Sequence, residues 1–515
     1  MMTMATHPDT GRGVPEGRAA HFRDLTVAIW RGGTRYPQSA PYHPAERYPE
    51  CPTGDVGAEE NPAYAGVRWC LRELGLDAVR FGSPQWNPLG ELVARGGKVV
   101  IKPNFVLSRH FEGGDLFAII THPATLRALV DFSYLAVGPE GRVIIADAPQ
   151  MDCHFEELLD ATQLPAVQDY YRRALRFDLE VLDLRDFCLE MQPGDEAGFS
   201  ERRRPLPGDP MGSAWVDLGR GSALAHAPNS ARFYGADYDR TETVALHHDD
   251  THRYRISRTV LSADLLLSVP KLKVHKKVGT TLNAKGLVGI TTTKNCLVHY
   301  TLGTPSSGGD QFPDGLLTAR EKVVSGGMRW LHDRLLAKRS PRHDHLYQML
   351  ASTYRAVVKP WLGGVAKEKQ ALDGGNWHGN DSAWRMVVDL MKIVYYADAD
   401  GRIHSDPQRR ILSLVDGIVG GENNGPLTPE RRPVGVIAAG RNPLAVDIAC
   451  TRLMGFDPTR LRWVPALLEG PFFTDLRAIS VRTDDERIRT MLTTRDPLLA
   501  FRPHPGWVGR VEIGP

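Results

Sequence analysis

The segment from 269 to 290, VPKLKVHKKVGTTLNAKGLVGI, carries five lysines and one histidine but no acidic side chain. Acidic residues are absent over the whole stretch from Leu265 to Gly309. Like charges placed side by side repel one another, so surface strands normally mix the two signs. Because the net charge of the chain is only +2, this positive charge is a local feature, and it indicates a binding site for an anion.

The spacing within this segment favours one binding face. If residues 271–275 are extended, Lys271, Lys273 and His275 project from the same side of the strand. Lysines supply point charges, while hydroxyls and backbone N–H groups near glycines supply directed donors for phosphate or carboxylate. We therefore predict that Lys271, Lys273, Thr281 and Lys285 bind an anion and that His275 is a catalytic acid or base. The alternative is an edge strand that lysines protect from aggregation.

Two other apolar runs break into polar residues that could face the same ligand. IKPNF presents Lys102 and Asn104, and IADAP presents Asp147. In parallel sheets, ligands bind outside the carboxyl ends of strands. We predict that Lys102 and Asn104 bind the anion and that Asp147 is catalytic. A helix-capping role for Asp147 and a solvated Lys102 remain the plain alternatives.

Acidic residues in the C-terminal half could bind a divalent metal ion at this site. Asp416 ends a strand run and is predicted to be catalytic, by holding metal or orienting the histidine. Asp447 lies on an apolar helix face, Glu422 lies in the polar turn GGENNG, and His299 ends the basic segment. These three are candidate metal ligands. The alternatives are a surface turn for Glu422 and a buried, paired carboxylate for Asp447.

Cysteine spacing argues against an iron–sulfur cluster or a structural zinc site. The six cysteines are scattered along the chain without C-x-x-C pairs, and the length makes a disulfide framework unexpected. No run of 18 apolar residues occurs, so we expect no transmembrane segment. The nearly balanced charge excludes a generic nucleic-acid coat. A cytoplasmic protein is the expectation, and the oligomeric state stays open.

Alternating strand and helix patterns position these residues. KVVIKPNFV (98–106) and GRVIIADAP (141–149) are strand-like runs, and a helical pattern beginning at Pro123 separates them. This order is typical of a βαβ unit with a parallel sheet. A further buried strand, ADLLLSVPKLKVH, leads into the basic segment. Runs at 409–420 and 433–440, followed by a helical pattern from Pro443, indicate a second α/β half.

The expected fold class is therefore α/β, with a mostly parallel sheet or sheets and flanking helices in two halves, plus a mainly helical insertion. We predict a disordered tail over 1–24 and a first α/β half with the basic motif over 25–304. The helical insertion, over 305–400, is expected to cover the sheet or the site. The second half and a closing segment occupy 401–515.

Taken together, VIKPNF, IADAP, VPKLKVHKKVGTTLNAKGLVGI, VDGIVGGENNGPL and AGRNPLAVDIACTRLMGFDP resemble the domain of unknown function 362 family. The matching motifs run in the family's order from about 98 to 460. Longer bacterial members are often encoded near polysaccharide or secondary-metabolite genes, which implies a role in such biosynthesis. The family has no settled activity. Its signatures fall on Lys271, Lys273, His275, Thr281, Lys285, Gly289, Asp416, Gly425, Pro426, Pro443, Ala445 and Asp447.

Two departures from the family pattern limit what the resemblance implies. Many members have Lys-Asn-Leu where this chain has Lys285, Gly286 and Leu287, so a family asparagine side chain is missing. The cysteine-rich, ferredoxin-like module fused to some members is also missing, which leaves built-in electron transfer unsupported.

These residues favour an enzyme that acts on an anionic small molecule, either phosphorylated or carboxylated. Two alternatives stay open. The lysines could bind an anionic ligand without catalysis, or basic helices such as RWLHDRLLAKRSPRHDH could dock acidic proteins or lipid headgroups.

Overall fold

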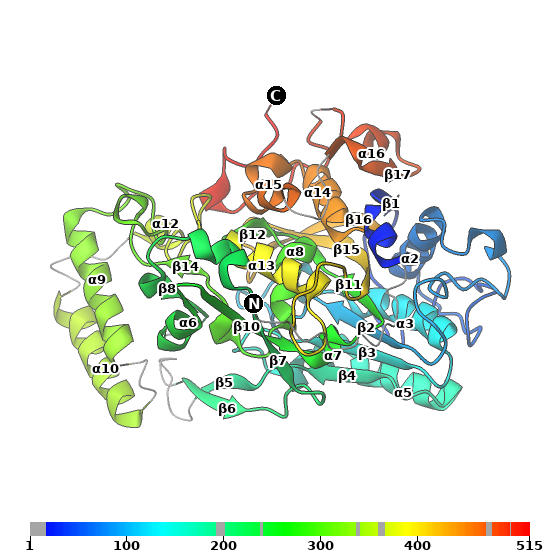
Figure 1. Ribbon diagram of the computed structural model, residues 1–515, viewed down its shortest axis with the longest axis horizontal. Helices are drawn as coiled ribbons and strands as arrows, with labels where there is room; N and C mark the ends of the chain where they lie inside the picture. Colours follow the sequence, from blue (N-terminus) through cyan, green and yellow to red (C-terminus); the bar gives the residue numbers. More distant parts are fainter. Residues whose placement is uncertain are drawn as a thin grey trace, which may run out of the picture.

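A large sheet with helices on both faces forms the centre of the molecule, and the helix pair α9 and α10 projects at one end (Figure 1). In this computed structural model, the description covers residues 17–191, 201–236, 240–335, 340–358, 366–469, 476–494 and 496–514. None of the helices among these residues combines the length and the apolar composition that crossing a membrane requires.

The central sheet has the strand order β17-β1-β16-β15-β11-β2-β3-β4. Neighbouring strands are parallel from β15 through β11, β2 and β3 to β4, whereas β16 is antiparallel to both β15 and β1. The predicted α/β class with a mostly parallel sheet is confirmed, and both halves of the chain contribute to one sheet. The strands are β1 (Thr26–Arg31), β2 (Lys98–Pro103), β3 (Arg142–Asp147), β4 (Glu180–Asp183), β11 (Leu265–Val269), β15 (Arg410–Glu422), β16 (Glu430–Gly440) and β17 (Ser480–Arg482).

Both faces of the sheet are buried, as is usual for parallel strands. Along β2, Val99 and Ile101 join one apolar cluster with the helices α2 (Pro62–Glu73) and α3 (Pro123–Val137). Val100 joins the opposite cluster with α13 (Ala383–Tyr396) and α14 (Pro443–Leu453). This alternation follows from the two-residue period of a strand, and it explains why these strands read as continuous apolar runs.

The basic segment continues the sheet beyond its neighbours. Strand β11 ends at Val269, and after Pro270 the chain forms β12 (Lys271–His275), which pairs in parallel with the second half of β15. The short strand β13 (Gly279–Thr280) then turns back antiparallel to β12. Because β15 is 13 residues long, it supports both β11 and β12. The lysines of β12 are thereby carried past the carboxyl ends of β2 and β3.

Part of the segment that was predicted to be a disordered tail is helical. Residues 1–16 lie outside the described part of the chain, but Gly17–Arg23 form helix α1. Within it, a ring nitrogen of His21 lies 2.7 Å from the Ile411 carbonyl oxygen, and Phe22 packs against Tyr395 with ring centroids 4.4 Å apart. Because residues 17–23 are mostly polar or small, their composition did not indicate these tertiary contacts.

The described residues between 305 and 400 contain helices and no strand. They form α9 (Ala319–Arg334), α10 (Pro341–Thr353), the π-helical turn Tyr354–Val358, α12 (Lys367–Gln370) and α13. Helix α13 buries its apolar face in the main core, together with side chains of β2, β3 and β15, so it covers one face of the sheet. A domain boundary at 400 would separate this helix from the sheet that it flanks.

Short strands that the sequence patterns did not reveal lie before β11, and one more, β14, follows it. They form small sheets of β5 with β6, of β7, β10 and β9, and of β8 with β14. The last of these is important for the site, because β8 (Phe233–Tyr234) pairs antiparallel with β14 (Tyr300–Thr301) and aligns Tyr234 with Tyr300. The remaining strands are β5 (Phe187–Met191), β6 (Glu201–Pro205), β7 (Ser213–Asp217), β9 (His247–His248) and β10 (Thr251–Ser257).

Candidate anion site

A cavity of about 480 Å³ lies where β2, β3 and β12 end. This volume is typical of sites for organic ligands. Cationic side chains outnumber acidic ones in its lining, with six lysines and one arginine against two aspartates among the described residues. The basic side chains are Lys102, Lys273, Lys276, Lys277, Lys285, Lys294, Arg329, His275 and His299, and the acidic ones are Asp147 and Asp152.

Asp147 lines the cavity but is fully engaged by the protein. Its carboxylate accepts hydrogen bonds from Lys102 Nζ at 2.8 Å and from the backbone N–H groups of Phe105 and Ala148 at 2.6 and 2.9 Å. Burial raises the pKa of Asp147, and the adjacent Lys102 opposes this effect. The geometry supports an anchoring role at the end of β3 in place of the predicted catalytic one.

Gly289 is packed against this ion pair. A Cβ atom at position 289 would lie 1.8 Å from Asp147 Oδ1 and 2.5 Å from Lys102 Nζ. We expect Gly289→Ala to break the pair and to lower the free energy of unfolding by about 3–5 kcal/mol, because it leaves a buried charge uncompensated. Denaturant unfolding measures this loss. Gly286→Ala is the matched control, since its Cβ would meet Pro270 at an ordinary 3.6 Å; equal stability of the two variants would contradict the prediction.

Lys271 and Asp416 form a second buried ion pair, which does not line the cavity. Lys271 Nζ lies 3.1 Å from Asp416 Oδ2 and 2.7 Å from the Tyr36 hydroxyl. Tyr36 in turn donates to Asp416, and the backbone N–H of His122 does so at 2.8 Å. Lys271, predicted as an anion ligand, and Asp416, predicted as a catalytic group, are therefore paired with one another outside the cavity lining. The compensating acid for Lys271 comes from the neighbouring strand β15.

This pair provides a stability test of its own. We expect Lys271→Met alone to cost about 3–5 kcal/mol of unfolding free energy, because Asp416 would stay buried without its cation. The double variant Lys271→Met/Asp416→Leu should lose less than the two single variants added together. A double-mutant cycle by denaturant unfolding measures the coupling. Additive losses would show that the two side chains do not stabilise one another.

The three predicted metal ligands lie in three different environments. Asp447 accepts hydrogen bonds from the backbone N–H groups of Asn283 and Ala284, both at 2.8 Å, at the start of α8 (Leu282–Gly286). Glu422 pairs with Arg432 and Arg502 at 3.0 and 2.8 Å. Of these three residues, only His299 lines the cavity. Among the described residues, no group of three or more His, Cys, Asp or Glu side chains is arranged to hold a metal ion, and the structure does not bring the predicted set together.

The lysines of the cavity divide into tethered and untethered groups. Lys273 Nζ donates to the carbonyl groups of Ile119 and Pro426, at 2.6 and 3.2 Å. Lys294 donates to Ala148 at 2.6 Å, and Lys277 donates to Gly374. The side-chain amine of Lys285, in contrast, makes no hydrogen bond with the described residues. It therefore has donors to offer a ligand.

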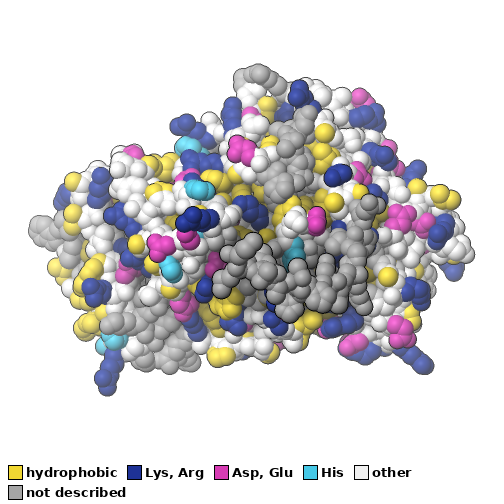
Figure 2. All heavy atoms as spheres, in the orientation of Figure 1, with side chains coloured by type: hydrophobic (Ala, Val, Ile, Leu, Met, Phe, Trp, Pro, Cys, Tyr) yellow, Lys and Arg dark blue, Asp and Glu magenta, His cyan; other side chains and the backbone are white. Residues whose placement is uncertain are grey.

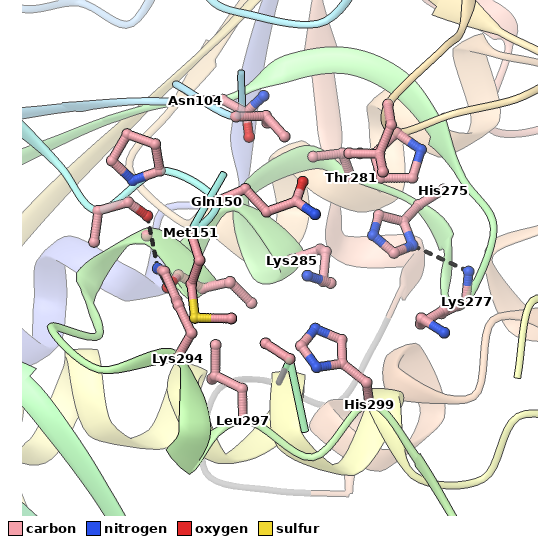
Figure 3. A pocket seen from close by; sticks show the side chains of 18 of the residues that line it. Asn104, Gln150, Met151, His275, Lys277, Thr281, Lys285, Lys294, Leu297 and His299 are labelled. Carbon is pink, nitrogen blue, oxygen red and sulfur yellow. Dashed lines mark hydrogen bonds between the residues drawn. The ribbon is translucent and has the colours of Figure 1, made fainter. Parts of the chain in front are cut away.

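His275, His299 and Thr281 surround Lys285 (Figure 3). Nδ1 of His275 accepts from the Lys277 backbone N–H at 3.1 Å, so a neutral ring carries its proton on Nε2. That second nitrogen faces Lys285 in Figure 3. The buried Thr281 Oγ1 and His299 Nδ1 have no hydrogen-bond partner among the residues that the structure describes. Polar atoms buried in this way normally bind a partner, which a ligand in the cavity would supply.

Aromatic and apolar side chains complete the cavity. Tyr234 and Tyr300 stack with ring centroids 4.9 Å apart. The Arg329 guanidinium of α9 lies 4.9 Å from the Tyr234 ring centroid, and Lys277 Nζ lies 5.2 Å from that of Tyr300. Asn104, as predicted, lines the cavity, although its amide also donates to Ile119 O at 3.0 Å. Apolar lining comes from Phe105, Val106, Met151, Leu189, Leu297 and Leu427.

Residues 204–452 match the family model described as Domain of unknown function (DUF362). This segment of the chain therefore belongs to the family. No curated protein is detectably similar to the chain. The DUF362 segment contains β12, Lys285, His299 and Arg329, whereas Lys102 and Asp147 come from the preceding part of the chain. The cavity therefore combines the family segment with strand ends outside it.

Burial lowers the proton affinity of the basic groups in this DUF362 cavity. The pKa of Lys285 falls to about 7 because of burial and the nearby charge of Lys102. Burial likewise lowers the pKa of Lys277 and of Lys294 to about 7. Desolvation and neighbouring lysines hold the pKa of His275 and His299 well below the usual range. The ligand-free DUF362 cavity thus has more basic groups than it can keep protonated at neutral pH.

Proposed function

We propose that this protein is an enzyme that binds an anionic organic molecule, a phosphate ester or a carboxylate, in the cavity around Lys285. The observation that carries the proposal is the excess of buried cationic side chains over carboxylates in one concave site. Desolvated cations attract an anion more strongly than exposed ones do. Ligand binding would also supply partners for Thr281 and His299.

We propose different roles for the two histidines. In neutral His275 the lone pair of Nδ1 is used by the Lys277 N–H, so this ring can donate a hydrogen bond through Nε2 to an anion. Nδ1 of His299 has no such partner in the described part of the chain. His299 is therefore the better candidate for accepting or returning a proton during a reaction. This assignment replaces His275, the catalytic acid or base that the sequence suggested.

Size and lining indicate a ligand that is more than a free inorganic anion. A cavity of about 480 Å³ exceeds what one phosphate group fills, and Met151 and Leu297 lie on the opposite side of Lys285 from Thr281 (Figure 3). We propose that the anionic group binds near Lys285 and that an apolar part of the ligand contacts these side chains.

Isothermal titration at pH 7 tests the binding step with phenyl phosphate, benzoate, inorganic phosphate and uncharged phenol. We expect phenyl phosphate to bind more tightly than inorganic phosphate, and phenol to bind much more weakly than either organic anion. Phenol binding as tightly as phenyl phosphate would overturn the proposed anion site.

Catalysis requires a separate measurement. A library of organic phosphates and carboxylates is incubated with the protein and with His299→Gln, and the products are identified by mass spectrometry. We expect a product that the parent forms and the variant does not. Tight binding without any product would support the non-catalytic alternative.

A further inference from the structure

Helices α9 and α10 form a pair that projects from the main body at one end (Figure 1). They pack on one another through Leu331 of α9, Leu335 directly after it, and Tyr347 and Ala351 of α10. This small core leaves other apolar side chains of both helices on the surface. The pair meets the cavity through Arg329 of α9.

Each helix presents a stripe of exposed apolar side chains. On α9, Val323 and Trp330 are 72% and 60% exposed and lie seven residues apart, on one face of the helix. On α10, Leu346, Met349 and Leu350 follow the same three- and four-residue spacing, and Met349 is 54% exposed. On the surface of a soluble protein, exposed apolar residues usually occur singly. Two stripes of them on neighbouring helices therefore indicate a docking surface.

Basic residues flank the apolar part of each stripe. Arg320 and Arg334 lie three residues before Val323 and four residues after Trp330, on the same face of α9, and Arg342 lies four residues before Leu346 on α10. The acidic side chains described in this pair are engaged by other elements. Glu321 pairs with Lys369 at 2.8 Å, and Asp333 pairs with Arg240 at 3.7 Å. Figure 2 shows yellow side chains interspersed with dark blue ones at this end of the molecule.

We propose that the exposed face of α9 and α10 docks on an anionic lipid surface. Tryptophan and aliphatic side chains of an amphipathic helix enter the boundary between headgroups and acyl chains, and arginines at its edges reach the lipid phosphates. A symmetric contact with a second copy is disfavoured, because it would bring equivalent arginine-flanked stripes against one another. The surface goes beyond the ligand site, and it would hold the Arg329 side of the cavity toward the membrane.

Co-sedimentation with vesicles tests this surface. The full chain is mixed with phosphatidylcholine vesicles that either contain or lack phosphatidylserine. We expect sedimentation with the anionic vesicles at low salt and release at high salt, because screening weakens the attraction. Sedimentation that is equal with both vesicle types, or absent with both, would overturn the proposal.

Surface variants identify the contact. Trp330→Ser/Met349→Ser removes two exposed apolar side chains and should abolish most of the binding, whereas Val79→Ser/Val508→Ser removes two exposed valines elsewhere and should not. Arg334→Gln and Arg342→Gln should each weaken binding about fivefold. Unchanged binding of these variants, at an unchanged thermal midpoint, would overturn the proposal. So would a dimer in solution that Trp330→Ser/Met349→Ser dissociates, or an acidic protein that displaces the chain from vesicles through this face only.

Discussion

Replacing Lys285 with methionine is expected to weaken phenyl phosphate binding roughly 10- to 100-fold, the value of a charge-assisted hydrogen bond lost from a desolvated site. The variant keeps most of the side-chain volume and removes the amine that makes no hydrogen bond with the described residues. The thermal midpoint of the ligand-free protein should stay equal or rise, because an uncompensated buried cation is replaced by an apolar group. Titration calorimetry and thermal unfolding measure the two effects.

Lys322→Met is the matched control, since Lys322 lies on α9, is exposed and does not line the cavity. It removes the same charge from the chain, so any general electrostatic effect appears in both variants. Equal affinities of Lys285→Met and Lys322→Met would place the anion elsewhere. Lys273→Ala is a poorer probe, because Lys273 also holds the carbonyl groups of Ile119 and Pro426.

Affinity for phenyl phosphate is expected to fall as the pH rises from 7 to 9. Lys277, Lys285 and Lys294 have a pKa of about 7 in the ligand-free cavity, so above pH 7 they are largely neutral. A bound phosphate dianion raises their pKa, and binding therefore takes up protons. Each proton taken up lowers the affinity by up to about tenfold per pH unit.

Calorimetry in buffers of different ionisation enthalpy counts these protons directly, and Lys285→Met should take up fewer. The ligand-free protein gives an independent check. Because the folded-state pKa of these lysines is below the usual 10.5, the unfolded chain binds more protons between pH 7 and 9, and the free energy of unfolding should increase with pH. The slope should be smaller for Lys285→Met. Binding without proton uptake at pH 8 would contradict the pKa shifts.

Local patterns in the sequence were sufficient to predict main strands of the central sheet. The apolar runs at 98–106, 141–149 and 409–420 correspond to β2, β3 and β15, and their polar ends at Lys102 and Asp147 do meet at one site. Side chains on the carboxyl ends of parallel strands converge because these ends lie at the same edge of the sheet. A buried strand run with a polar end is therefore enough to predict that its polar residues lie at a shared site.

Partners that come from distant segments could not be predicted in the same way. The alternation in β12 places Lys271 beside Lys273, but only the pairing with β15 brings Asp416 within reach of Lys271 and removes both from the cavity. Arg329 belongs to a helix that the sequence indicates, yet its contact with Tyr234 depends on how that helix packs. Asp447 lies on an apolar helix face, as expected. Its carboxylate accepts hydrogen bonds from backbone N–H groups at the start of α8, a partner that the sequence did not indicate.

The pairing of β1 has a consequence for the synthesis of the chain on the ribosome. Val27 to Arg31 of β1 align with residues 436–440 of β16, and Thr26 to Ala28 align with β17. More than 400 residues must be added before either partner strand exists, which takes roughly 20–80 s at the usual rates of translation. During that time TVAIWR is an apolar strand without its neighbours, the kind of segment that chaperones bind. Early synthesis should therefore depend on chaperones more than the fold of the finished protein suggests.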